Sequence, residues 1–137
     1  MTLRQQLIDD LKRDEGFRHF PYECSAGKLT IGYGRNLDAK GISKEEAEIL
    51  LINDITDAEM ELYKVLPDAK LFSDNRYRVL VNMVFNLGLD GFLTFKKMLK
   101  AIKEKDFDRT ADEMLNSKWH EQLPDRVDRL EKLMRND

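Results

Sequence analysis

Three residues near the N-terminus have side chains that together can support acid–base chemistry: Glu15, Cys24 and Thr30. A carboxyl group can donate or accept a proton, a thiol becomes a base or nucleophile when it ionises, and a hydroxyl can hold a water molecule. Cys24 follows Glu15 by nine positions, and Thr30 follows Cys24 by six. If Glu15 ends a helix and the other two lie on a hairpin, the three side chains can meet at one spot.

The segment that carries them, DEGFRHFPYECSAGKLTIGYG at residues 14 to 34, concentrates unusual residues. It holds the only cysteine, four of the eleven Phe and Tyr residues and four of the seven glycines. From 17 to 36, Phe, Tyr, Thr and Ile alternate with Gly and Lys, which predicts a small antiparallel sheet of two or three short strands. Each candidate taken alone is ordinary: an exposed glutamate, a small buried cysteine, a strand threonine. Their common spacing is what singles them out.

A short helix is predicted before this sheet and a long one after it. Apolar residues at helical spacing mark residues 3 to 13 as an amphipathic helix that stops at Gly16. Ser43 and Glu46 form a capping box, and one apolar stripe then continues to Pro67. The second helix is therefore expected to cover about six turns.

The second half of the chain is predicted to be a compact helical lobe. Its helices are expected at residues 74 to 87, 93 to 105, 107 to 116 and 124 to 135, the last with a proline in its first turn. The first of them, which contains RYRVLVNMVFNLG, is apolar on most faces and is expected at the centre of the lobe. The fold class is thus α+β and predominantly helical.

The length of 137 residues predicts one domain, which can have two lobes. A small β-containing lobe is placed at about residues 14–43 and a connecting helix at about 44–66. The helical lobe covers 67–137 together with the N-terminal helix at 1–13. A layout of this kind can leave a cleft between the lobes, and such clefts are common ligand sites.

The composition excludes several classes of protein. A net charge of −3 argues against a dedicated nucleic-acid binder, and 42% hydrophobic with 36% charged residues is typical of a soluble globular chain. No apolar run approaches the roughly 20 residues of a membrane-spanning helix, and the charged N-terminus lacks a signal-peptide core. A single cysteine fits folding in a reducing cytoplasm. His19 and His120 have no metal-ligand spacing, so no metal site is predicted.

The spacing of Glu15, Cys24 and Thr30, with TIGYG beginning at Thr30, resembles the catalytic signature of the phage-type lysozymes, endolysins similar to the T4 phage lysozyme. The middle position of that signature is Asp or Cys. The resemblance continues in NMVFNLG at 82 to 88, in GFLTFKKML at 91 to 99 and in SKWHEQLPDRVDRL at 117 to 130. It covers essentially the whole chain in order.

The resemblance implies a lysozyme-like fold: a β-containing N-terminal lobe, a long connecting helix and a helical C-terminal lobe, with the cleft between. It also implies an N-acetylmuramidase that cleaves the β-1,4 bond between N-acetylmuramic acid and N-acetylglucosamine in peptidoglycan, without metal or cofactor. Compared with larger members, the chain is shortened between Gly34 and Ser43, which removes part of the small lobe.

The resemblance assigns catalytic roles to the three residues. Glycoside hydrolysis needs an acid to protonate the departing oxygen and a group on the opposite face to handle water or attack the sugar. Glu15 is expected as the acid and Thr30 as a holder of the water. A thiol with an ordinary pKa of about 8.5 is mostly neutral at pH 7. Whether Cys24 orients water, takes a proton or attacks carbon stays open.

Two arginines match ion-pairing positions of the family. Arg126 is expected to pair with Glu15, and Arg129 with Asp14. A neighbouring cation favours the ionised carboxylate and so opposes proton donation. Substrate binding would therefore have to loosen the pair at Glu15.

Five further positions carry over by motif. Phe85 matches an aromatic that lines the cleft, and Asn86 with Trp119 matches a hydrogen-bonded pair that joins two helices. Asn36 and Glu113 align with substrate contacts, although their residue types differ from those of the T4 enzyme.

The expected function is that of an endolysin made in the host cytoplasm as a monomer, which reaches periplasmic peptidoglycan after a holin opens the inner membrane. No nucleic-acid partner and no stable membrane insertion are expected. One alternative is a catalytically inactive wall-binding or regulatory protein of the same fold. Another is a helical nucleic-acid module, which the acidic balance disfavours.

Overall fold

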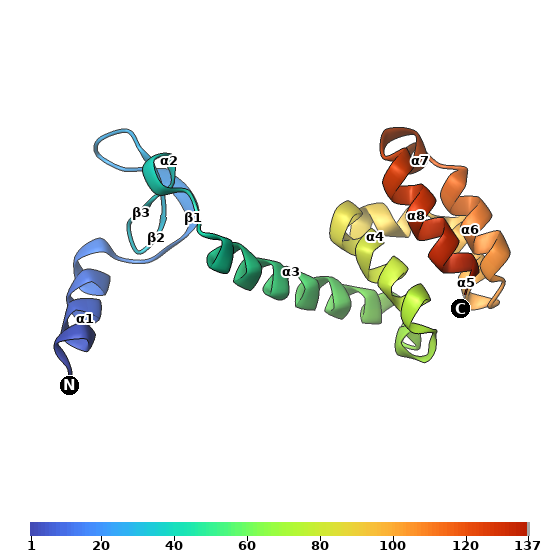
Figure 1. Ribbon diagram of the computed structural model, residues 1–137, viewed down its shortest axis with the longest axis horizontal. Helices are drawn as coiled ribbons and strands as arrows, with labels where there is room; N and C mark the ends of the chain where they lie inside the picture. The colour runs from blue at the N-terminus through green and yellow to red at the C-terminus, as the bar shows by residue number, and fades with distance from the viewer. Residues whose placement is uncertain (137) are drawn as a thin grey trace. The chain divides into compact units, whose positions relative to one another are not determined.

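The computed structural model describes residues 1–136. Contacts divide the chain into two compact units, Met1–Ile49 and Leu50–Asp137. The chain is mostly helical with one small antiparallel sheet, which confirms the predicted fold class. Figure 1 labels the elements of both units.

The first unit contains α1, a small sheet, α2 and the beginning of α3, all labelled in Figure 1. The helix α1 is Leu3–Glu15, and the sheet has the order β1-β2-β3. The other elements are β1 (Arg18–Glu23), β2 (Leu29–Gly32), β3 (Arg35–Asn36), α2 (Leu37–Lys40) and the first turns of α3 (Lys44–Val65).

Both ends of α1 have sequence-encoded caps. The side chain of Thr2 accepts a hydrogen bond of 3.0 Å from the N–H of Gln5. Gly16, with φ 68° and ψ 169°, ends the helix, and its N–H bonds to the carbonyl of Lys12. A glycine tolerates this positive φ without steric cost. The predicted stop is confirmed, and Glu15 is the last helical residue.

The sheet is built on β2, which pairs with strands on both sides. Thr30 lies opposite Tyr22 of β1 and opposite Asn36 of β3. Between β1 and β2 the chain turns tightly, with the N–H of Cys24 on the carbonyl of Lys28 at 2.9 Å. The predicted small sheet is confirmed, and Thr30 occupies its central strand.

The capping box that begins α3 is confirmed. The N–H of Glu46 donates to the Ser43 hydroxyl at 3.1 Å, and the N–H of Ser43 donates to Glu46 Oε1 at 2.8 Å. The helix runs over 22 residues, as the apolar stripe predicts, and Ala58 and Leu62 of that stripe are buried.

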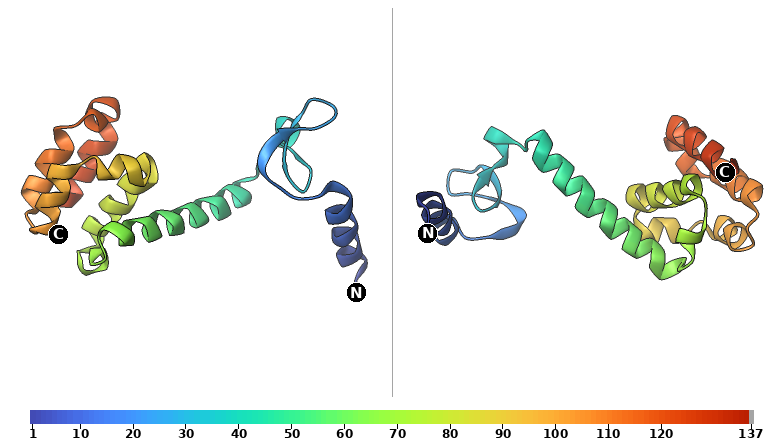
Figure 2. Two further views of the ribbon diagram at one scale, coloured as in Figure 1. Left: turned by 180° about the vertical axis from the view of Figure 1, so that it is seen from behind. Right: turned by 60° about the horizontal axis from the view of Figure 1, so that its bottom comes forward.

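The second unit is a helical lobe in which α4 (Asp74–Leu93), predicted at its centre, contributes more buried residues than any other helix. Buried α4 residues include Val79, Leu80, Met83 and Val84. The remaining elements are η1 (Ala69–Leu71), α5 (Lys96–Lys103), α6 (Phe107–Leu115), α7 (Lys118–Gln122) and α8 (Pro124–Arg135). Helices α6 and α8 lie side by side in both Figure 1 and Figure 2.

The sequence predicted an end of α4 at Gly88, and the structure places a break there and then more helix. Gly88 has φ 72° and ψ 166°, and helical geometry resumes and continues to Leu93. The residue therefore kinks the segment, because its backbone leaves helical space at one position only. Two short helices, α2 and α7, were not predicted because four or five residues are too few to show a helical period.

Among the described helices, none alone combines the length and the apolar composition needed to cross a membrane. The bent pair of α4 and α5, with 106° between the two helices, reaches this length and apolar composition only when both helices are taken together. Its apolar residues, such as Met83, Phe92 and Ile102, form the core of the second unit.

A leucine pair tests the position of this core. Leu80 is 0% exposed and Leu71 is 82% exposed. Leu80→Ala is expected to lower the free energy of unfolding by about 2–5 kcal/mol, because it leaves a cavity. Leu71→Ala should change it by no more than about 0.5 kcal/mol. Urea unfolding followed by the fluorescence of Trp119 measures both, and equal losses would contradict the assignment.

Candidate functional site

The carboxyl group of Glu15 lies against the backbone of Gly34. A Cβ built on Gly34 would stand 2.8 Å from Glu15 Oε2 and 3.0 Å from its Cδ, and Gly34 has φ +80°. Any side chain at position 34 would thus meet both a strained backbone and the carboxyl of Glu15. The last glycine of TIGYG is what lets the end of α1 approach the turn between β2 and β3.

Cys24 and Thr30 lie together on the other hairpin, formed by β1 and β2. Thr30 is 4% exposed, and its hydroxyl donates to the carbonyl of Lys28 at 2.9 Å. The same hydroxyl is within hydrogen-bonding reach of the half-buried Cys24 thiol. A hydroxyl has one proton, so it serves one of these acceptors at a time.

The surroundings of Cys24 favour its thiolate. The backbone N–H groups of Lys28 and then of Ala26 lower the pKa of the Cys24 thiol, and the hydroxyl of Thr30 adds to this effect. Hydrogen bonds to the charged form stabilise it, while partial burial opposes them. From the sequence alone the thiol is expected to have its ordinary pKa, and the turn that follows Cys24 lowers that pKa.

The three candidates belong to one unit and to two hairpins that share β2. Thr30 lies on β2 itself, Cys24 lies at the turn into that strand, and Glu15 contacts the turn that leaves it. A carboxyl group that touches the turn after β2 and a thiol–hydroxyl pair beside the start of β2 therefore belong to one small unit.

Asn36, a predicted substrate contact, has a local structural role. Its side-chain oxygen caps α2 by accepting from the N–H of Ala39 at 3.0 Å. Asp38 of that helix accepts from the N–H of Leu29 at 2.7 Å. The side-chain oxygen of Asn36 is thus engaged within its own unit.

Arg126, in the second unit, is held by a residue that the sequence analysis missed. Its Nε and Nη2 donate to Asn82 Oδ1 at 2.9 and 2.7 Å. The signal in the sequence that could have identified Asn82 is the NMVFNLG motif, of which it is the first residue. Both residues line a cavity of about 470 Å³ together with Phe85.

The predicted pairs of Arg126 with Glu15 and of Arg129 with Asp14 stay predictions. Each would join a residue of Leu50–Asp137 to one of Met1–Ile49. Within its own unit, Asp14 Oδ1 lies 3.8 Å from Nε of Arg13.

Trp119 and Asn86 form a hydrogen bond between α7 and α4. Trp119 Nε1 donates to Asn86 Oδ1 at 2.8 Å. The indole is buried and meets the ring of Phe95 edge-on, with centroids 6.1 Å apart. A buried indole N–H with a partner carries no desolvation cost, so this pair fixes the position of α7 on α4.

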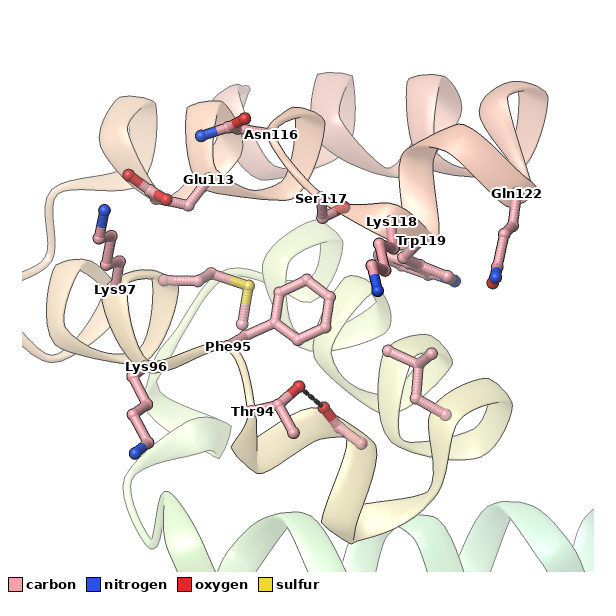
Figure 3. A pocket seen from close by; sticks show the side chains of 13 residues that line it. Thr94, Phe95, Lys96, Lys97, Glu113, Asn116, Ser117, Lys118, Trp119 and Gln122 are labelled. Carbon is pink, nitrogen blue, oxygen red and sulfur yellow. Dashed lines mark hydrogen bonds between the residues drawn. The ribbon is translucent and has the colours of Figure 1, made fainter.

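Glu113 lines a second cavity, of about 580 Å³, drawn in Figure 3. Phe95 and Trp119 contribute aromatic surface, and Asn116 contributes an amide. The cavity is also lined by three lysines, Lys96, Lys97 and Lys118. Lys96 and Lys97 begin α5, and beside this cavity their charges favour anionic groups.

The thiol of Cys24 offers a direct titration. Its alkylation rate by iodoacetamide should rise with pH through a midpoint below that of the same protein unfolded in urea, because the folded turn favours the thiolate. Thr30→Val removes one hydrogen-bond donor and should move the folded midpoint upward. Since Cys24 is the only cysteine, one site reacts. Equal folded and unfolded midpoints would contradict the stated cause.

Known proteins match this chain over nearly its full length. The "Probable T4-type lysozyme 1" of Dictyostelium discoideum is 34% identical over 90% of this chain and 90% of its own length. An "Endolysin" of Acyrthosiphon pisum secondary endosymbiont phage 1 is 33% identical over 87% of this chain and 80% of its own. The "Endolysin" of Salmonella phage P22 is 31% identical, with 84% and 82% covered.

The sequence model of the family described as "Phage lysozyme" matches residues 12–135. That range includes Glu15, Cys24 and Thr30 and continues through α8. The resemblance found in the sequence is confirmed, and the chain belongs to the phage lysozyme family.

Proposed function

We propose that this chain is an endolysin that hydrolyses the β-1,4 bond between N-acetylmuramic acid and N-acetylglucosamine in peptidoglycan. The observation that carries the proposal is that the Glu15 carboxyl, at the end of α1, lies against the turn after β2, while Cys24 and Thr30 form a thiol–hydroxyl pair on the same sheet. Membership of the family and the similarity to two phage endolysins support the same activity.

Glu15 is the proposed general acid. Its carboxyl protonates the oxygen of the departing sugar while the glycosidic bond breaks. Its contact with the Gly34 backbone limits the positions that the carboxyl can take. A donor held in one place avoids part of the entropic cost of reaching the transition state.

Thr30 and Cys24 are proposed to act on the water that attacks the opposite face of the sugar. The Thr30 hydroxyl can hold that water, and the Cys24 thiolate can accept its proton. This route inverts the anomeric carbon because water attacks once. The competing route, in which the thiolate attacks carbon and forms a covalent glycosyl intermediate, would leave Thr30 without a clear task.

The alternative of an inactive wall-binding protein is less well supported. The carboxyl, the thiol and the hydroxyl that the reaction needs are all present and belong to the first unit. The proposed substrate is bacterial peptidoglycan, which the chain, as a monomer, would reach after a membrane-permeabilising partner of the holin type opens the inner membrane. The result of its action would be host lysis and release of phage.

Glu15→Gln tests the acid. The amide keeps the shape of the side chain and cannot donate a proton as an acid, so turnover should fall by about 10²- to 10⁴-fold. The release of reducing ends from purified peptidoglycan measures turnover, and circular dichroism checks the fold. Glu48→Gln, an exposed glutamate on α3, is the matched control and should retain wild-type activity. A Glu15→Gln variant as active as the control would remove Glu15 from the mechanism.

The anomeric form of the first product tests the route. NMR of freshly released sugar should show the α-anomer, because a single attack by water inverts a β bond. Cys24→Asp should retain substantial activity, since a carboxylate can take the same proton. A β-anomer as first product, with loss of activity in Cys24→Asp, would point to attack by the thiolate.

A further inference from the structure

Arg35 makes contacts that the proposed chemistry leaves unexplained. Its Nη1 and Nη2 donate to the two carboxylate oxygens of Glu46, at 2.9 and 2.7 Å, in a bidentate pair. Nη1 also donates to the carbonyl of Gly41 at 3.0 Å. One guanidinium thus joins β3, the segment after α2 and the first turn of α3. We call this set the Arg35 clamp.

The clamp is fixed from the other side by the capping box. The Glu46 carboxylate that receives Arg35 also accepts from the N–H of Ser43 at 2.8 Å. This N–H and then the guanidinium of Arg35 lower the pKa of Glu46 to about 2, so the pair stays charged at any working pH. Bidentate guanidinium–carboxylate pairs fix geometry as well as charge.

The strand that the clamp holds is very short. β3 consists of Arg35 and Asn36, so its ladder with Ile31 and Thr30 of β2 has two residue pairs. A ladder of this length gives little resistance to fraying. The side chain of Arg35 is therefore the larger restraint on this strand.

The residue before Arg35 is Gly34, and the carboxyl of Glu15 lies against the backbone of Gly34. A shift of β3 would move that backbone and, on the other side, release Thr30 from Asn36. Glu15 and Thr30 would therefore lose their positions together. A displacement of about 1 Å is enough to reduce turnover by about 100-fold.

We propose that Arg35 is a positioning residue for the hydrolytic site, which holds the Gly34 turn against Glu15 through its bidentate pair with Glu46. This inference rests on the proposed function for its kinetic consequence and on the contacts alone for its structural one. It assigns no contact between Arg35 and substrate.

Arg35→Lys is the most informative variant, because it keeps the positive charge and loses the bidentate hydrogen bonds to the carboxylate. We expect kcat on purified peptidoglycan to fall about 10- to 100-fold, with KM changed by no more than about twofold. The kcat of Arg35→Ala should fall at least as far as that of Arg35→Lys. Arg109→Lys, on the exposed surface of α6, is the matched control and should leave both constants unchanged.

Amide hydrogen exchange by NMR supplies a readout that is independent of turnover. Exchange should become faster in β2 and β3 of Arg35→Lys and stay as in the wild type in α4, because only the small sheet loosens. A uniform increase over the chain would indicate global destabilisation and overturn the proposal. Should Arg35→Ala fail to fold, Arg35→Lys decides.

The kinetic constants separate this proposal from its competitors. A higher KM with unchanged kcat and unchanged exchange would make Arg35 a substrate contact, and unchanged constants would exclude a positioning role. If wild-type protein releases no reducing ends, the proposed function fails, and the exchange comparison still tests whether Arg35 holds the turn.

Discussion

The contact between the Glu15 carboxyl and the backbone of Gly34 constrains much of the first unit. α1 ends at Glu15 because Gly16 stops it, and a side chain at position 34 would displace the carboxyl and strain a backbone that has φ +80°. The contact requires the turn to stay in place although the strand that follows has two residues. Three features lie around this approach: the cap at Gly16, the positive φ of Gly34 and the ion pair of Arg35. Two of them need glycine, which accounts for part of the concentration of glycines in this segment.

The sequence predicted the elements whose signals are periodic or local. The stop at Gly16, the capping box of Ser43 and Glu46 and the buried face of α4 were all correct, because caps and apolar stripes depend on neighbouring residues. The continuation of α4 beyond Gly88 could not be foreseen. A glycine stop signal and a glycine kink look alike in sequence, and only packing of the following turn separates them.

For the site, spacing identified the residues, and the partners of each residue came only from the fold. Nothing in the sequence connects Arg126 to Asn82, because a hydrogen bond over 44 positions follows from how α8 packs on α4. The lowered pKa of Cys24 depends on where the backbone N–H groups of Ala26 and Lys28 point, which is a property of the turn. The pairing of Arg35 with Glu46 likewise depends on where the first turn of α3 lies relative to β3.

The position of Trp119 has a spectroscopic consequence. It is the only tryptophan in the chain, and it lies beside Phe95 in the wall of the lysine-lined cavity shown in Figure 3. The indole emission of the protein therefore comes from a single place, where the ring is buried against Phe95 and bonded to Asn86. The molecule therefore has its own optical reporter of how α7 packs on α4, and changes in that packing can be followed without any label.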